Sequence, residues 1–404
     1  MLSCIESLST EEEGDFSAGV TVESSGVDHS LSTISASGGS VIDPGVARLT
    51  VYSLTLGPRC TVAAVCDANP GRREQLTARY GCDRAYAGLE ELLADDSVDA
   101  VAIFTGAPDH ASHSIAAMEA GKHCICAVPA AMTLDDCKAL IEAKERTGMR
   151  YMMAETSYYR WETILMRDLY ESGEFGEITY SEVEYYHPIY QGHEERDHYW
   201  WDADGKPTWR HGFVPMLYPT HSTGFLVGVT RERLVSASGL GSGPSDDPNM
   251  GAGRNQYDNP FSSQAALMET SGGHICRCNV MFGIHAHGER AQWFGERSAA
   301  YMAGSGGQPF VVQLEGRDPI TELPDYWDRL PDAMRDEGGH GNSHPFLTHE
   351  FISAIVDDRE PAIDVYESVA MTAPGIVAHQ SSLQGGIQLP VPNFDPSTGA
   401  CTEV

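Results

Sequence analysis

The sequence predicts an α/β protein in which a doubly wound parallel sheet is followed by a second domain built on an antiparallel sheet. Its 404 residues exceed the ~250 to 300 residues at which single cores stop growing, so we expect two domains. Up to residue 154, buried apolar stretches alternate with helical patterns, which is typical of a parallel sheet covered by helices. After Glu155, alternating polar and apolar residues favour an antiparallel sheet with one exposed face.

The elements of the first domain follow from apolar runs and helix-start signals. A continuous apolar run predicts a buried strand, whereas apolar residues three and four apart predict a helix. Thr133 with Asp136 three residues later is a typical helix start. The predicted strands are 60–66, 98–104, 123–126 and 150–153, and the predicted helices are 46–56, 72–80, 90–93, 110–120 and one beginning near 133.

Composition sets the remaining boundaries. Residues 1–40 are rich in Ser, Gly and Glu, so we expect an irregular or disordered segment there. The first domain is predicted at 41–154 and the second at 155–395, followed by a tail at 396–404. The second domain is expected to contain a strand at 178–185 and helices at 346–356 and 368–382.

The charge balance argues against polyanionic partners. Acidic residues outnumber basic ones by 58 to 26, and a net charge of -32 repels nucleic acid and anionic lipid. No apolar run approaches the ~18 residues of a membrane span, and the N-terminus lacks a signal-peptide pattern, so we expect a cytoplasmic protein. The acidic, lysine-poor composition favours a halophilic source; an acidic mesophile with a GC-rich genome is the alternative.

Neither the cysteines nor the histidines have the spacing of a metal site. The ten cysteines include no zinc-like pair of pairs, and we expect reduced, mostly buried thiols. The histidines lack a His-Glu-x-x-His helix, so no metal is predicted. The histidines that come near one another in the sequence but lack this spacing are His187, His193, His198, His285 and His287.

Several segments together resemble the Gfo/Idh/MocA oxidoreductases, nicotinamide-dependent enzymes that act mostly on sugars, inositols and related polyols. The resemblance implies a Rossmann domain that binds NAD at 41–154. It also implies a substrate-binding and oligomerisation domain at 155–395, built on a large, mostly antiparallel open sheet, and a homodimer or homotetramer. The matching segments are VAAVCDANP at 62–70, EAGKH at 119–123, GEFGEI at 173–178, YPTHS at 218–222, and GNSH at 341–344 with FISAI at 351–355.

The cofactor site implied by this resemblance is incomplete at its glycine turn. Gly45 and Val46 open a helix whose amides would face the diphosphate, and Asp67 follows 22 residues after Gly45 as the ribose ligand. An acid there favours NAD, while Arg72 leaves NADP open. The family's first two glycines align with Ile42 and Pro44, and the strand before them, 31–36, is poor. Either the start of the chain is altered or frame-shifted, or tight dinucleotide binding has been lost.

Two further stretches align with cofactor contacts. The resemblance places Thr105, Gly106, Pro108 and His110 at the cofactor, although Gly and Pro there also suit a tight strand-to-helix turn. Val128 with Pro129 stands where the family has Glu-Lys-Pro, which removes the usual lysine; a branch of the family with Val-Pro-Ala-Ala is similar here.

Proton transfer is assigned mainly to His221, which aligns with the family's catalytic histidine and has a side chain suited to a base near neutral pH. A histidine satisfied at a helix start is the alternative. Tyr218 and Glu155 are the other catalytic candidates. The substrate-binding candidates are Tyr158, His187, Lys206 and Arg210, with structural hydrogen bonding, core packing or a subunit contact as alternatives.

Three functions remain open at this point. The first is an NAD(P)-dependent oxidoreductase that acts on the CH-OH groups of a sugar, polyol or inositol-like substrate by hydride transfer. The second is an NAD-dependent glycosidase or lyase that uses transient oxidation. The third is a catalytically silent member that only binds a ligand, which Val128 and the altered glycine turn favour.

Overall fold

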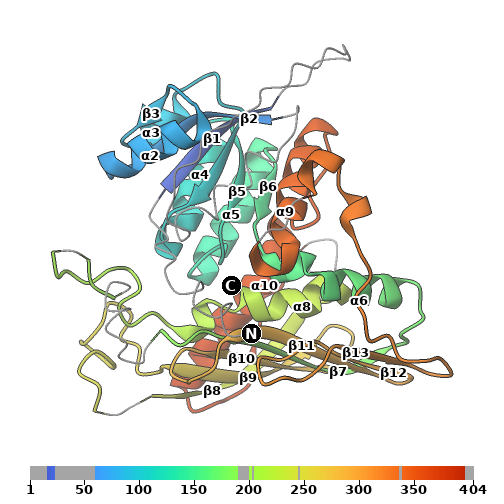
Figure 1. The fold of residues 1–404 in the computed structure, drawn as a ribbon. Helices are drawn as coiled ribbons and strands as arrows, with labels where there is room; N and C mark the ends of the chain where they lie inside the picture. The colour runs from blue at the N-terminus through green and yellow to red at the C-terminus, as the bar shows by residue number, and fades with distance from the viewer. Residues whose placement is uncertain are drawn as a thin grey trace, which may run out of the picture.

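The computed structural model describes residues 16–22, 60–189, 200–202, 204–243, 246–335 and 339–395. These residues form two sheets (Figure 1). Helices α8 (Thr220–Thr230) and α10 (Val365–Leu383) lie between the sheets. This arrangement confirms the predicted fold class of a Rossmann-like sheet followed by a large, mostly antiparallel one.

The first sheet has six strands in the order β3-β2-β1-β4-β5-β6. β2 pairs with β3, β4 with β5 and β5 with β6 in parallel. The strands are β1 (Phe16–Val22), β2 (Cys60–Asp67), β3 (Ala85–Tyr86), β4 (Ala100–Phe104), β5 (His123–Cys126) and β6 (Tyr151–Met153). The helices that accompany them are α2 (Pro70–Tyr80), α3 (Leu89–Leu93), α4 (His110–Glu119) and α5 (Leu134–Thr147).

The ends of these helices follow from local chemistry. Thr133 caps α5 because its hydroxyl accepts a hydrogen bond from the N–H of Asp136, as the sequence pattern predicts. Asn69 caps α2 by accepting from the N–H of Gly71. Both helices end at a glycine in the left-handed conformation, Gly81 and Gly148, which a residue with a Cβ adopts only at a cost.

Strand β1 runs opposite to its neighbours. It pairs antiparallel with both β2 and β4, and Phe16 lies beside Asp67 and Phe104. The chain therefore leaves β1 at the edge opposite Asp67, whereas a dinucleotide-binding turn leaves its strand at the carboxyl edge of the parallel strands. β1 lies within the segment for which irregular structure was predicted. The candidate strand 31–36 and the predicted helix 46–56 lie outside the described residues.

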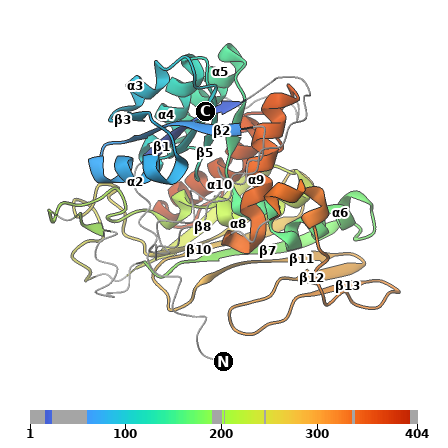
Figure 2. The same ribbon diagram turned by 45° about the horizontal axis from the view of Figure 1, so that its top comes forward.

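The second sheet has eight strands in the order β13-β12-β11-β7-β10-β9-β8-β14. β7 and β10 are parallel, and the other paired strands are antiparallel. One face packs against helices, and the other bears no helix of the described part of the chain (Figures 1 and 2). The strands are β7 (Ile178–Tyr186), β8 (Leu234–Ser242), β9 (Ser263–Thr270), β10 (Ile275–Met281), β11 (Gly288–Gly295), β12 (Ser298–Tyr301), β13 (Val311–Leu314) and β14 (Leu389–Pro390).

Helices α8 and α10 pack on the inner face of this sheet, whereas α6 (Trp161–Glu171) packs against α8 and α9 (Gly339–Val356) packs against α6. Residues 220–229 of α8 are all buried, because the helix is enclosed between the second sheet and other helices. None of the helices in the described ranges is both long and apolar enough to cross a membrane. The eight cysteines in these ranges are free and buried, as predicted for reduced thiols.

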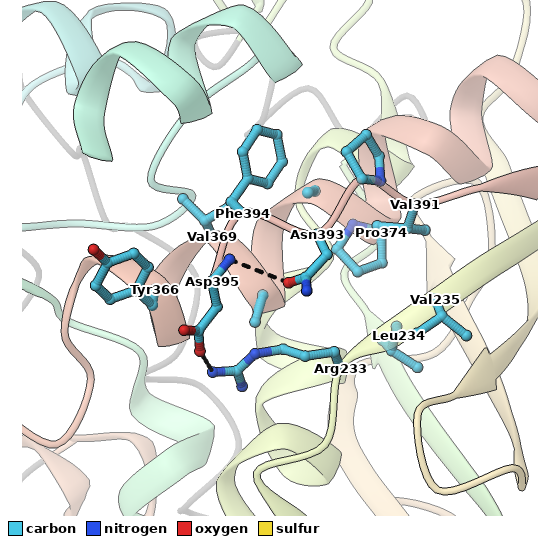
Figure 3. Close-up of a pocket in the computed structure, with 13 residues that line it drawn as sticks. Arg233, Leu234, Val235, Tyr366, Val369, Pro374, Val391, Asn393, Phe394 and Asp395 are labelled. Carbon is cyan, nitrogen blue, oxygen red and sulfur yellow. Dashed lines mark hydrogen bonds and ion pairs between the residues drawn. The ribbon is translucent and has the colours of Figure 1, made fainter. Parts of the chain in front are cut away.

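The chain beyond β14 packs beside α10 at a buried ion cluster (Figure 3). Arg233 Nη2 lies 2.7 Å from Glu367 Oε1 and 2.7 Å from Asp395 Oδ2. The three side chains are 13%, 8% and 10% exposed, so water screens their charges weakly. The cluster therefore ties the C-terminal segment to β8 and α10.

Replacing Arg233 by Met is expected to lower the free energy of unfolding by about 3 kcal/mol, because two buried carboxylates lose their shared cation. The measurement is the urea midpoint at constant salt. Arg146→Met is the matched control, since its 2.6 Å pair with Glu119 is 57% and 53% exposed. That control is expected to cost less than about 1 kcal/mol. Equal losses for the two variants would contradict the assigned role of the cluster.

Candidate active site

A hollow lies where the carboxyl ends of β4 and β5 face the second domain. Its cavity volume is about 30 Å³, and the empty space reaches about 320 Å³ when its opening to solvent is counted. This edge of a parallel sheet is where ligands bind in open α/β folds. We call it the β4–β5 hollow, and its lining residues are Phe104, Thr105, Ala107, His110, Ala127, Val128, Trp209 and Tyr218.

A buried glutamate–histidine pair stands next to this hollow. Glu155 follows β6, and His221 lies in the first turn of α8. His221 Nδ1 lies 3.0 Å from Glu155 Oε1, and the ring of Tyr218 meets the ring of His221 edge-on at 5.3 Å. Tyr218 therefore connects the pair to the β4–β5 hollow.

Close packing fixes the Glu155 carboxylate. Its Oε1 accepts hydrogen bonds from the N–H and the hydroxyl of Ser157, at 2.8 and 2.7 Å. Gly224 on α8 makes this approach possible, because a Cβ there would lie 2.3 Å from Ser157 Oγ and 2.9 Å from Glu155 Cγ. The carboxylate is thereby aimed at Nδ1 of His221, which leaves Nε2 for a substrate.

The two side chains shift each other's pKa in opposite directions. Burial alone would lower the pKa of His221, but the charges of Glu155 and Glu289 outweigh it and raise the pKa to about 9. Burial alone would raise the pKa of Glu155, but the charge and hydrogen bond of His221 lower it. At neutral pH the pair is therefore an imidazolium beside a carboxylate.

Aromatic rings surround His221. The ring of Tyr185 lies 4.9 Å from it, and the ring of His340 is stacked on it at 6.0 Å. His187 in turn is stacked on Tyr185 at 5.9 Å. These rings form a wall that can pack against the apolar face of a sugar or polyol.

A left-handed turn brings His340 to this position. His340, Gly341 and Asn342 have φ values of 52°, 63° and 65°, and His340 Nδ1 lies 2.9 Å from His344 Nε2. Such a turn is costly for residues other than glycine and is often found at functional sites. A Cβ at Gly341 would lie 3.2 Å from Nη1 of Arg160.

Arg160 and Glu289 form a second ion pair near His221. Arg160 donates to Glu289 Oε2 from Nη2 at 2.7 Å and from Nε at 3.1 Å. Burial alone would raise the pKa of Glu289, but the interactions with Arg160, His221 and His340 outweigh burial and lower the pKa to about 2. Glu289 therefore remains ionised and favours the protonated form of His221.

The structure brings only some of the predicted site residues together. His221, Glu155, Tyr218 and His187 lie within one cluster of contacts, and Arg210 lies over the ring of Trp209, 4.3 Å from its centre. Gly45 and Val46 lie outside the described residues.

Two substrate-binding predictions are not supported by the positions of the side chains. Tyr158 is fully buried beneath the guanidinium of Arg167, at 4.1 Å, and packs against Gly228, so it belongs to the core. Lys206 is exposed in a turn whose backbone bonds to Asp202. We correct the assignment of Tyr158, whereas substrate binding by Lys206 stays a prediction.

The sequence reasoning also passed over Tyr185, Glu289 and His340 as site residues. Glu289 comes beside Tyr185 through the pairing of β11 with β7, which no local pattern reveals. For His340, the flanking glycines at 338, 339 and 341 were a usable signal of an unusual turn.

Several residues of the predicted cofactor site lie in the described ranges. Asp67 ends β2, but it is 3% exposed, its Oδ1 accepts from the N–H of Asn69 at 2.6 Å, and its Oδ2 lies 3.7 Å from Arg72, so its role as ribose ligand stays a prediction. Val128 lines the β4–β5 hollow, and Gly106 and Pro108 form the tight turn between β4 and α4. The carbonyl of Pro129 is bonded to His110 at 2.8 Å. No group of three or more potential metal ligands gathers in the described ranges.

Family comparisons agree with this geometry. Residues 47–155 match the model described as "Oxidoreductase family, NAD-binding Rossmann fold", and residues 324–399 match "Glycosyl hydrolase 109, C-terminal domain". Each match covers a part of the chain, and the first agrees with the resemblance to the Gfo/Idh/MocA oxidoreductases. The N-terminal part of the chain is thus an NAD-binding oxidoreductase domain, and the match to that model begins just after the altered glycine turn.

Individual proteins similar to this chain include glycosyl hydrolase family 109 proteins and a sugar dehydrogenase. A glycosyl hydrolase family 109 protein of Solibacter usitatus is 25% identical over 76% of this chain and 73% of its own length. A family 109 protein of a Shewanella species is 34% identical, but the match spans only 40% of this chain and 34% of that protein. The crystal structure of levoglucosan dehydrogenase with NADH and L-sorbose superposes with a TM-score of 0.66 at 18% identity, covering 82% of this chain and 90% of that one.

Proposed function

We propose that this chain is an NAD(P)-dependent oxidoreductase that acts on a CH-OH group of a sugar, polyol or inositol-like substrate. The observation that supports it most is the buried Glu155–His221 pair beside a hollow at the carboxyl edge of an NAD-binding domain. The carbohydrate class is supported by the bound L-sorbose of levoglucosan dehydrogenase and by the aromatic wall around His221.

The residues have separate tasks in this proposal. A bound NAD⁺ would accept the hydride from the carbinol carbon. The neutral form of His221, which accumulates as the pH approaches its pKa of about 9, takes the hydroxyl proton at Nε2, so the alcohol becomes a carbonyl and one proton leaves with the histidine. Glu155 holds Nδ1 and stabilises the imidazolium that results. Tyr218 lies between His221 and the β4–β5 hollow and orients the hydroxyl. His187 and Arg210 bind the rest of the substrate.

The second candidate is an NAD-dependent glycosidase or lyase, and the family 109 match over residues 324–399 favours it. In that case oxidation is transient: the hydride returns to the substrate after the glycosidic bond breaks. The high pKa of His221, about 9, suits the acid role that such a cycle also requires.

One experiment separates these two functions. Purified protein is incubated with NAD⁺ and a panel of polyols, free sugars and aryl glycosides in molar KCl, in D₂O. An oxidoreductase accumulates NADH. A glycosidase releases the aglycone without net NADH and leaves deuterium on the sugar. Tight binding of NAD⁺ without either reaction would support the silent member instead, and failure to bind any nicotinamide cofactor would exclude both enzymes.

We further propose a homodimer or homotetramer in the cytoplasm of a halophile. The outward face of the second sheet carries Leu240, Leu267 and Ile275, which are 65%, 54% and 48% exposed on three adjacent strands. The charge of -32 supports the halophilic source. Light scattering in molar KCl should give a multiple of the 43.8 kDa chain mass, and the mass of one chain would contradict the oligomer.

A further inference from the structure

His110 is the first residue of α4 and forms part of the wall of the β4–β5 hollow. Its side chain is almost completely buried, with 2% of the residue exposed. Of the eight residues that line this hollow, His110 is the one whose side chain can carry a positive charge. Val128, in the same lining, stands where a lysine would be expected and carries none.

Both ring nitrogens of His110 face carbonyl oxygens. Nδ1 lies 2.8 Å from the carbonyl oxygen of Pro129, and Nε2 lies 2.7 Å from that of Thr105. A neutral imidazole has one N–H, so one of these contacts would place a lone pair against a lone pair. An imidazolium donates at both nitrogens and satisfies both carbonyls.

The surroundings agree with a charged ring. Burial by itself lowers the pKa of His110, whereas an ionised Cys126 on β5 and the hydrogen bonds to the two carbonyls raise it. With Cys126 as a neutral thiol, the two carbonyls are the groups that favour the charged ring. The position at the N-terminus of α4 opposes a cation. The two short hydrogen bonds to carbonyl oxygens act directly on the ring and oppose this effect.

We propose that His110 is a permanent imidazolium in the wall of the β4–β5 hollow and biases a bound nicotinamide cofactor toward its reduced form. The nicotinamide ring of NAD⁺ is cationic and that of NADH is neutral, so a fixed positive charge beside the ring disfavours only the oxidised form. This inference rests on the proposed function, because it needs the nicotinamide ring in this hollow.

The consequence concerns the first step of either proposed reaction. Oxidation of the substrate CH-OH group moves a hydride to NAD⁺ and releases a proton, and it removes the positive charge from the ring beside His110. An imidazolium there makes this step more favourable than it is in water.

The test is the ratio of the dissociation constants of NAD⁺ and NADH, measured by NADH fluorescence and by competition. His110→Gln is expected to lower the preference for NADH roughly tenfold. A purely structural role would weaken both forms equally and leave the ratio unchanged, and that result would overturn the proposal. His113→Gln is the matched control on the same helix; His113 bonds to the Thr105 hydroxyl at 3.0 Å and does not line the hollow, so its ratio should change less than about twofold.

A second measurement tests the charge without any cofactor. ¹⁵N NMR of histidine-labelled wild-type protein at pH 7 should show both ring nitrogens of His110 protonated, and one unprotonated nitrogen would overturn the proposal. If His110→Gln does not fold, the binding ratio is measured on His110→Asn, while the NMR result still stands. If wild-type protein binds neither NAD⁺ nor NADH, the proposed function fails. The NMR measurement then still decides whether His110 is an imidazolium, so the two failures can be told apart.

Discussion

Replacing His221 by Asn is expected to lower kcat on the best substrate by about 10³-fold, within the range of general acid–base catalysis. Asn fills a similar volume but cannot exchange a proton with the substrate hydroxyl near neutral pH. Because His221 is not among the residues that line the β4–β5 hollow, the affinity for NAD⁺ should change less than about twofold. Steady-state kinetics and a cofactor titration on the same preparation measure both effects.

The control for this variant is a histidine away from the pair. His349→Asn removes a half-buried ring on α9 whose Nδ1 lies 2.9 Å from the hydroxyl of Ser353. Its kcat should stay within about twofold of the wild type. If His221→Asn turns over at the wild-type rate, the proton transfer takes place at another group and the assignment of His221 is wrong.

The regular elements of the first domain could be predicted because their burial is encoded locally. The runs 60–66 and 98–104 are apolar over nearly their whole length, and they became β2 and β4. Strand β1 was missed, since Phe16–Val22 is short and lies among Ser, Gly and Glu residues. Its strand conformation depends on pairing with β2 and β4, which are distant in the sequence.

Candidate site residues could be predicted from the sequence only where they lie at the end of a strand or the start of a helix. Glu155 after β6 follows from the rule that ligands meet the carboxyl edge of a parallel sheet, whereas His221 at the start of α8 was proposed because its segment aligns with the family's catalytic histidine. Glu289 could not be found this way, because its place next to Tyr185 is set by the register of β11 on β7. Tyr158 was misassigned because the short turn after Glu155 directs its ring into the core.

Replacing Glu155 by Gln is expected to move the pH dependence of alcohol oxidation toward lower pH by more than about one unit. In the wild type, neutral His221 accumulates as pH rises toward its pKa of about 9, so kcat/KM should rise up to that pH and then level off. Gln keeps an oxygen for Ser157 and for His221 Nδ1 but carries no charge. The pKa of His221 then falls toward its ordinary value of about 6.5.

The same variant should lower the maximal rate by about 10²-fold, because the imidazolium formed during oxidation loses its carboxylate partner. Glu232→Gln is the matched control, since Glu232 also pairs with a histidine, His274, at 3.3 Å but lies outside the site. Its pH profile should be that of the wild type. Glu155 contributes most to the raised pKa of His221, so its replacement must lower that pKa. If kcat/KM of Glu155→Gln still rises up to about pH 9, a group other than His221 titrates in the reaction.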